Sequence, residues 1–410
     1  MLHPKMLHTY CGVDSHKNSH TVVLMNCFHE RLGELVVSNT PSDFEAFLKQ
    51  AKKLCAKGTT LAFGFEDTTS FGRSLVKFLV EHKQLVKHVN SNLVTAERNA
   101  MNTLAKTDSI DAECACRVLI NRFDSLPNAN PKDKYWLMTK LVNRRDSLMK
   151  NNSTLKNQLH SAVADVYPNY KKIFKLILSN SSLAFYERYP SPKHLLDSSV
   201  DELAQLLSSA SKKRLKDKKA YDIWAVVLAD GVKESQHQSS HDFIVKSTVR
   251  QLRNNLLEIE ETTKQMEELL THFDYQLQSM NGISTVLAAS LIAEIGDIRR
   301  FKTPASLATY SAVAPVTYAS GESGVQYANS KGNRRLNETF FQLALTQVIP
   351  IGPSKKLLNP VMREYYLKKQ ADGKTKRQAL KLVQRRLVNI IWRMMTDKVP
   401  YINPEPSYVG

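Results

Sequence analysis

Residues 107–119, TDSIDAECACRVL, decide how the first part of the chain is read. Asp108 and Asp111 stand three residues apart at the start of an expected helix, so their side chains share one helical face. Two interpretations are open. In the first, Thr107 or Asp108 caps the helix and Asp111 is an acid that the helix N-terminus favours. In the second, the two carboxylates belong to a site, which needs further acids close by.

The chain before this helix alternates short apolar runs with amphipathic segments, which predicts a mixed sheet covered by helices. Pro41 lies in the first turn of one helix, where Ser42 and Glu45 fit a capping box. We therefore expect an α/β domain over 1–130. Its expected strands are 10–14, 20–27, 34–38, 60–65 and 85–89. Its expected helices begin near residues 40, 70 and 107, and residues 94–102 lead into the last of them.

Further acids stand at the ends of two of these strands. Asp14 ends the first strand and Glu66 ends the fourth. Open α/β sheets form their sites at the carboxyl ends of strands. Gathered there with the two helical acids, these carboxylates would repel one another unless a divalent cation neutralised them. Mg²⁺ takes oxygen ligands, and two such ions can stabilise the attacking and leaving oxygens of phosphoryl transfer.

Each of these residues also has a plainer interpretation. Asp14 can be a turn residue, and Glu66 with Asp67 can cap the following helix; we expect Asp67 to be the cap and not a ligand. His16 and Lys17 fit phosphate contacts or solvated turn residues better than catalytic groups. The plain interpretation would have to hold at all four acids at once, which favours the magnesium site.

The composition indicates a polyanionic partner. Lysine and arginine number 57 against 39 aspartate and glutamate residues, a formal net charge of +18. Nucleic acid is the first candidate partner, and a merely basic protein is the alternative. The five cysteines are odd in number and lack metal-ligand spacing, which predicts reduced thiols and a cytoplasmic protein. No apolar run is long enough to cross a membrane, so no membrane partner is expected.

The middle of the chain, 131–275, is expected to be helical. Long helices are predicted over 131–167 and 241–272, separated by a less regular stretch at 170–240 that contains the basic cluster KKRLKDKK. In the second helix, apolar side chains recur at alternating spacings of three and four, a coiled-coil seam. Packing within the chain and self-association explain this seam equally well. Its members are Leu252, Leu256, Ile259, Met266 and Leu270, with Thr263 in one position.

The last part, 276–402, is expected to form a mainly helical domain, followed by a tail at 403–410. A turn around Gly282 separates two helices and offers backbone N–H groups to a phosphate. Ser320 lies in a Gly-rich loop, where it is either a turn residue or a nucleophile toward phosphate. Cations follow it at the start of a helix, and a closing helix is strongly basic: Lys331, Arg334 and Arg335, then Arg377, Lys381, Arg385 and Arg386.

Three segments together resemble a known family. The sequence GVDSHK at 12–17, FED at 65–67 and KTDSIDA at 106–112 are similar to the DEDD transposases of bacterial insertion sequences, the IS-one-ten family with its IS-one-triple-one relatives and the invertase Piv. The resemblance implies an RNase H-like, RuvC-like fold for 1–130. It also implies that four acids bind Mg²⁺ and are catalytic. Matched to this sequence, these are Asp14, Glu66, Asp108 and Asp111.

The resemblance extends to the C-terminal part. Tyr318-Ala319-Ser320-Gly321, followed by SKGNRR at 330–335, matches an element whose serine forms a covalent bond to DNA in that family. It implies that Ser320 is catalytic and that Lys331, Asn333, Arg334, Arg335 and Gly282 bind nucleic acid. The turn around Gly282 resembles a helix-hairpin-helix element. Asn281 and Ser284 replace the Pro and the second Gly that are usual there. The stretch at 170–240 is long for the family, which implies an inserted subdomain.

The resemblance implies a transposase, or DNA recombinase, that cuts and rejoins strands through a phosphoserine intermediate. Its implied partners are double-stranded DNA, a noncoding bridge RNA and further copies of itself in a dimer or tetramer, in the bacterial cytoplasm at the nucleoid. The alternative enzyme is a metal-dependent junction nuclease that hydrolyses DNA with water. A nucleic-acid-binding protein with a degenerate site is the non-enzymatic alternative.

Overall fold

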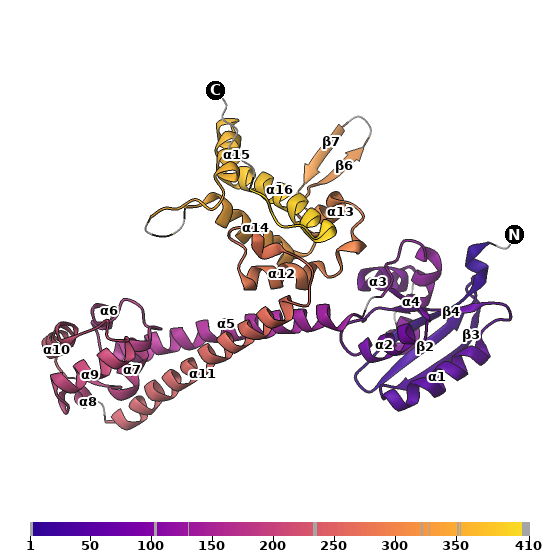
Figure 1. Cartoon of the computed structure of the whole chain (residues 1–410). Helices are drawn as coiled ribbons and strands as arrows, with labels where there is room; N and C mark the ends of the chain where they lie inside the picture. Colours follow the sequence, from indigo (N-terminus) through magenta and orange to yellow (C-terminus); the bar gives the residue numbers. More distant parts are fainter. Residues whose placement is uncertain are drawn as a thin grey trace. The chain divides into compact units, whose positions relative to one another are not determined.

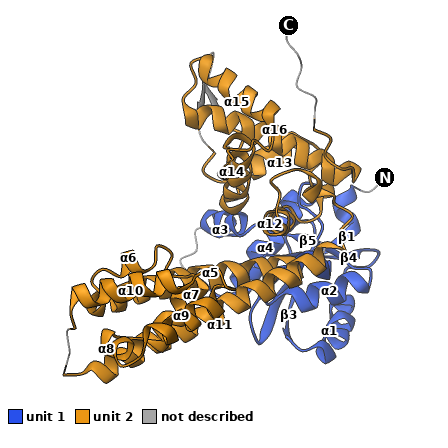
Figure 2. Ribbon diagram, turned by 60° about the vertical axis from the view of Figure 1, so that its left-hand side comes forward, with its two compact units in different colours: residues 1–136 blue, residues 137–410 orange. Residues whose placement is uncertain are grey.

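A computed structural model describes residues 3–101, 105–129, 131–232, 236–320, 323–327, 329–350, 352 and 354–403, with only the backbone at 317–320 and 323–326. The chain divides into two compact units, residues 1–136 and 137–410 (Figure 2). The division falls six residues after the expected boundary at 130, and both the middle and the C-terminal segments lie in the second unit. Gly321 and most of the tail lie outside the described residues.

A five-stranded mixed sheet organises the first unit (Figure 1). Its order is β3-β2-β1-β4-β5, in which β1 is antiparallel to β2 and parallel to β4. The remaining pairs are β2 with β3, antiparallel, and β4 with β5, parallel. The strands are β1 (His8–Ser15), β2 (Ser19–Met25), β3 (Arg31–Ser38), β4 (Thr60–Phe65) and β5 (Leu85–His88).

Alternating side chains of β1 supply two different cores, one on each face of the sheet. Val13 packs in a cluster with Phe44 and Leu75 from α1 (Pro41–Leu54) and α2 (Arg73–Glu81). Tyr10 packs in a second cluster with Ala112 and other residues of α4 (Asp108–Arg122) and with Val94 of α3 (Ser91–Ala100). The period of two along β1 thus buries both faces.

Two details of the expected helix caps are wrong. Helix α1 starts after Thr40 with no side-chain cap, so Ser42 and Glu45 form no capping box. Asp67 does not cap α2, whose N-cap residue is Gly72. Instead, the Asp67 carboxylate accepts hydrogen bonds from the N–H groups of Thr69 and Ser70 in the preceding turn, at 2.9 and 2.7 Å. The Asp67 carboxylate therefore stabilises the turn before α2 and not the first turn of the helix.

Two long antiparallel helices begin the second unit, α5 (Asp133–Val166) and α11 (Gln238–Leu270) (Figure 1). They pack against each other through polar contacts. The buried Asn255 Nδ2 donates to the Leu148 carbonyl at 2.9 Å. This pairing turns Leu256 and Ile259 partly toward solvent, so the expected seam is only partly buried. Among its apolar members, Leu252 and Met266 are the buried ones.

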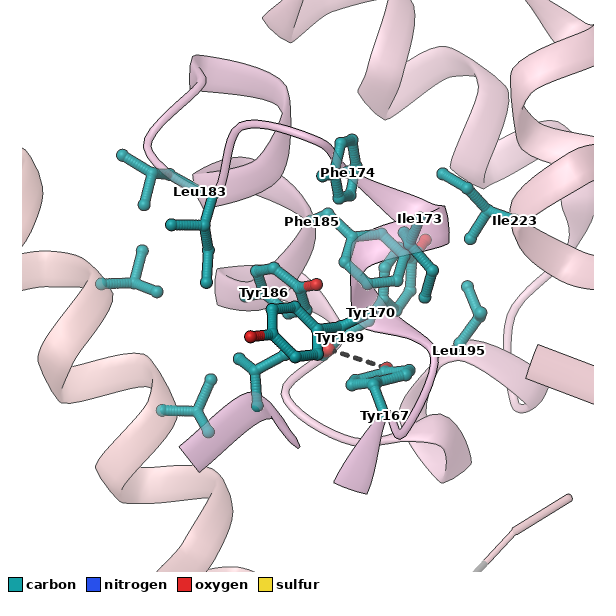
Figure 3. Packing of buried hydrophobic residues seen from close by; sticks show 14 of the residues in the cluster. Tyr167, Tyr170, Ile173, Phe174, Leu183, Phe185, Tyr186, Tyr189, Leu195 and Ile223 are labelled. Carbon is teal, nitrogen blue, oxygen red and sulfur yellow. Dashed lines mark hydrogen bonds between the residues drawn. The ribbon is translucent and has the colours of Figure 1, made fainter. Parts of the chain in front are cut away.

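Between these helices, the inserted segment forms a small helical subdomain with its own aromatic core (Figure 3). Its buried rings include Phe174, Phe185 and Tyr186, and the hydroxyl of buried Tyr167 donates to the Tyr189 carbonyl at 3.0 Å. The basic cluster at 212–219 runs from the turn after α9 into the first residues of α10. The helices are α6 (Tyr170–Ile173), α7 (Asn180–Arg188), α8 (Pro192–Leu196), α9 (Val200–Ala210) and α10 (Asp217–Asp230).

The C-terminal part of the second unit contains a β-hairpin in addition to the expected helices. Strands β6 (Val316–Ser320) and β7 (Ser323–Tyr327) pair in antiparallel register, so Ser320 ends a strand and does not lie in a loop. The helices are α12 (Thr285–Ile295), α13 (Pro304–Tyr310), α14 (Arg334–Val348), α15 (Pro360–Ala371) and α16 (Lys376–Asp397). In the described part of the chain, no helix could cross a membrane.

Candidate active site

The sheet register brings the backbones of Asp14 and Glu66 next to each other. Val13 of β1 pairs with Phe65 of β4 in parallel register, and the two acids follow them directly. Val13 and Phe65 belong to the same core cluster, so Asp14, the next residue of β1, faces the opposite side of the sheet, where α4 packs. Glu66 follows the last residue of β4, so the two acids lie at the same edge of the sheet.

A glycine lets the first turn of α4 reach this edge. A Cβ atom on Gly12 would lie 2.1 Å from the Ala112 carbonyl oxygen and 2.3 Å from the Cys116 backbone nitrogen. No side chain fits there, so α4 lies directly against β1. Thr107 caps the helix by accepting the N–H of Ile110 at 3.2 Å, which fixes Asp108 and Asp111 in the first turn.

The structure brings Asp14 and Asp108 together around His16. The His16 Nε2 atom lies 3.0 Å from Asp14 Oδ2 and 3.2 Å from Asp108 Oδ1. One ligand atom of each of these three residues lies within 4.8 Å of the others. Asp111 forms an ion pair with Arg98 of α3, and Glu66 is partly buried outside this three-residue group.

Burial and charge act on these groups in opposite directions. Burial raises the pKa of Asp14; His16 lowers it again, while the negative charges of Asp111 and Asp108 raise it. Burial lowers the pKa of His16, but the carboxylates of Asp14 and Asp108 raise it by more, so its net pKa lies above 6.5. The acids thus repel one another and favour the charged form of the imidazole. A divalent cation would relieve the same repulsion.

Sequence reasoning missed the positions of His16 and Arg98 in this cluster. His16 is two residues beyond Asp14 and was expected to be a phosphate contact or a turn residue. Arg98 lies on α3, and nothing in its sequence surroundings connects it to Asp111. The one signal in the sequence was Gly12, because a glycine inside an apolar strand can mark the close approach of another backbone, here that of α4.

In the second unit, the expected nucleic-acid contacts have different surroundings. The side chain of Ser320 lies outside the described residues. Asn333 caps α14 by accepting the N–H of Leu336 at 2.9 Å, and its amide donates to Glu294 at 2.8 Å. Arg335 pairs with Asp146 at 2.6 Å and Glu294 at 3.2 Å. Both side chains therefore have internal partners, although Arg335 is exposed, as are Lys331 and Arg334.

The turn at Gly282 has an internal role in this structure. Its φ is +95°, a conformation that favours glycine. The neighbouring Asn281 carbonyl accepts a hydrogen bond from the Gln347 Nε2 atom at 2.7 Å, and Gln347 also accepts from Asn359. A Cβ on Gly282 would lie 2.7 Å from Gln347 Nε2. The glycine thus lets the turn pack against α14.

Comparison with known families matches both functional parts of the chain. Residues 11–168 match the DEDD model of the IS110 group, described as a transposase. Residues 274–367 match the model of transposases of the IS116/IS110/IS902 family. The two spans together cover more than half of the chain and contain all four acids as well as Ser320. Residues 169–273, with the inserted subdomain, lie between them.

Proteins of insertion elements are similar along most of the chain. The uncharacterized 44.8 kDa protein of insertion element IS116 from Streptomyces clavuligerus is 25% identical over 396 residues, 95% of each chain. The uncharacterized 42 kDa protein of IS900 from Mycobacterium paratuberculosis is 24% identical over 402 residues, 96% of each chain. The uncharacterized 43.6 kDa protein of IS110 from Streptomyces coelicolor is 25% identical over 314 residues, 74% of each. With both domain matches, these relatives show that the chain belongs to the IS110 family of insertion-sequence transposases.

Proposed function

We propose that this transposase cuts and rejoins DNA through a phosphoserine intermediate on Ser320, with divalent metal held by its first unit. The observation that carries the proposal is the meeting of Asp14 and Asp108, with Asp111 near enough to affect the pKa of Asp14. The strand order and mixed pairing of the sheet are consistent with an RNase H-like fold. The acids lie at the carboxyl ends of strands, where open α/β sheets bind their ligands.

Asp14, Glu66, Asp108 and Asp111 are the proposed metal ligands. Carboxylate oxygens are the donors that Mg²⁺ prefers, and the mutual repulsion around Asp14 fits a site made for a cation. His16 and Arg98 supply the compensating positive charge in the described residues. When bound, the metal would stabilise charge on the oxygens of a phosphodiester. For Asp14 and Asp108 to bind the ion, His16, which lies between them, has to give up its contacts with their carboxylates.

The proposed reaction balances without an external oxidant or reductant. The Ser320 hydroxyl attacks the phosphorus of a DNA phosphodiester, so that an Oγ–P bond forms and the P–O3′ bond breaks. The serine proton is released and the 3′ oxygen leaves as a hydroxyl. Attack by the 3′ hydroxyl of a partner strand reverses these bonds and frees Ser320. A noncoding bridge RNA and a homo-oligomer complete the proposal by family resemblance.

The test of the nucleophile is covalent capture of DNA. We expect the wild-type protein with Mg²⁺ and DNA of its element ends to form an adduct that survives denaturing electrophoresis. Ser320→Ala should abolish the adduct, and Asp14→Asn should reduce it by at least about a hundredfold, as for loss of an electrostatic catalytic group. Ser354→Ala, a change at an exposed serine of the same unit, is the matched control and should keep it. Adducts in the Ser320→Ala protein would disprove the assignment.

The alternative, a water-using nuclease, predicts a different product from the same experiment. It gives free cleaved ends and no protein–DNA adduct, with Ser320→Ala as active as the wild type.

Sequencing the RNA that copurifies with the protein tests whether a noncoding RNA guides it. A recurrent noncoding segment from beside the gene, matching the insertion junction, is the expected result.

A further inference from the structure

A cavity of about 790 Å³ lies in the second unit at the base of the β6–β7 hairpin. Pro315, just before β6, and Tyr327, the last residue of β7, line it together with residues from α14 and α16. The cavity therefore lies between the hairpin and two helices that are separate in the sequence. The expected nucleic-acid contacts at 331–335 included one of its lining residues, Arg334.

The charged side chains of this cavity are all positive. Five cations line it and no carboxylate does, as far as the described residues show: Arg334, Lys374, Arg377, Lys381 and Arg385. Other cations of this region have acidic partners, as Arg335 has Asp146 and Arg393 has Asp397. In the described part of the chain, none of the five cavity cations forms an ion pair.

The protein holds part of this cluster in place without neutralising it. Lys381 Nζ donates to the Ala312 carbonyl at 3.0 Å, and Arg385 donates to Asn389 at 2.7 Å. Both partners are uncharged, so the positive charge stays available. Burial and the neighbouring Arg377 lower the pKa of Lys381. Gathering these like charges costs free energy that an anionic ligand would recover.

Backbone dipoles add to the same field. Helix α14 begins at Arg334 and α16 begins at Lys376, after its N-cap Thr375. Residues of both first turns, Arg334 and Gln378, line the cavity. Helix N-termini carry partial positive charge and bind phosphate groups. Two helix starts and five cations around one cavity match several phosphates, and the apolar part of the lining, Ala314, Pro315 and Leu382, suits sugar rings.

We infer that this cavity binds the sugar-phosphate backbone of the DNA strand that the hairpin presents for cleavage. The inference rests on the proposed role of Ser320, which ends strand β6. From Val316, beside the cavity, to Ser320 the strand rises about 13 Å. At a rise of about 3.4 Å per nucleotide along the duplex axis, the cavity would hold phosphates within roughly four nucleotides of the scissile bond.

The experiment measures DNA binding by the full chain with covalent chemistry removed. In a Ser320→Ala background, the double variant Arg334→Gln/Arg377→Gln removes two exposed cavity cations that lack ion pairs. Lys368→Gln/Arg393→Gln removes the same charge from exposed positions outside the cavity and is the matched control. Fluorescence anisotropy with a labelled DNA duplex, and with an RNA duplex of equal sequence, is recorded over a salt series.

We expect the cavity variant to bind DNA roughly tenfold more weakly than the control, with a salt slope smaller by about two. Equal affinity and slope in the two double variants would overturn the inference. So would a loss confined to the RNA duplex, which would assign the cavity to RNA. The binding experiment uses Ser320→Ala proteins throughout, so its result does not depend on covalent chemistry. If the wild-type protein forms no DNA adduct, the assignment of Ser320 as nucleophile fails, and the binding result stands.

Discussion

His16 lies between two carboxylates that raise its pKa, and this predicts its titration. Because folding raises its pKa above 6.5, the paired imidazolium stabilises the folded state below pH 6.5, and that stabilisation is lost as the pH rises through the folded pKa. The side chain is half exposed, so the contribution should stay below about 1 kcal/mol. NMR titration of the His16 ring should give a pKa above 6.5, lowered by Asp14→Asn and by Asp108→Asn.

Metal addition distinguishes a cation site from a simple ion pair in the same titration. If Asp14 and Asp108 bind Mg²⁺, the ion competes with the imidazolium, and the pKa of His16 should fall when Mg²⁺ is added. Titration of the metal-free protein in the presence of EDTA gives the baseline pKa. An unchanged pKa at saturating Mg²⁺ would mean that the ion does not bind beside His16.

At this scale, the sequence predicted the acids better than their partners. Asp14 and Glu66 could be placed because each was expected to end an apolar strand, whereas the parallel pairing of β1 with β4 was not predicted. Asp108 and Asp111 could be placed from helical spacing. The partners of these acids could not be foreseen, because the pairing of Arg98 with Asp111 depends on how α3 packs against α4, for which local sequence holds no signal.

The packing of α4 on β1 gives a prediction at the scale of elements. Gly12→Val should destabilise the protein by about 3 kcal/mol or more, because the new side chain meets the backbone of α4, which cannot move without opening a core. Gly33→Ala is the control, since its Cβ would meet only the flexible end of Leu54, at 2.9 Å. Chemical unfolding followed by circular dichroism measures both. Similar stabilities would show that α4 is not held against β1.

Elements with strong periodicity were predictable, and those set by tertiary contacts were not. Residues 60–65 and 285–295 form the expected strand and helix. The β6–β7 hairpin was expected to be a loop because glycine and serine are poor strand formers. Its pairing places Ser320 opposite Ser323. In the long helices, the buried Asn255 of α11 donates a hydrogen bond to α5. The buried face predicted from the apolar seam therefore differs from the face that packs on α5.

The boundary between the two units shows how whole-molecule organisation depends on a few side chains. Arg73 of the first unit pairs with Asp133 and lies over the Trp136 ring, 4.3 Å from its centroid. The Trp136 indole N–H also donates to the Thr69 carbonyl at 2.8 Å. The first turn of α5 is therefore part of the first unit. A change from strands to helices in the sequence placed this boundary at 130, before these contacts.

The same contacts predict how the first unit behaves when produced alone. Its two core clusters draw only on residues up to Ala129, so residues 1–136 should fold cooperatively without the rest of the chain. A fragment ending at residue 130 loses Asp133 and Trp136 and should be less stable by about 1–2 kcal/mol, the range of a cation–π contact with one hydrogen bond. Trp136→Ala in the longer fragment should reproduce much of this loss. Thermal and urea unfolding measure all three proteins, and equal stability of the two fragments would place the boundary at 130 after all.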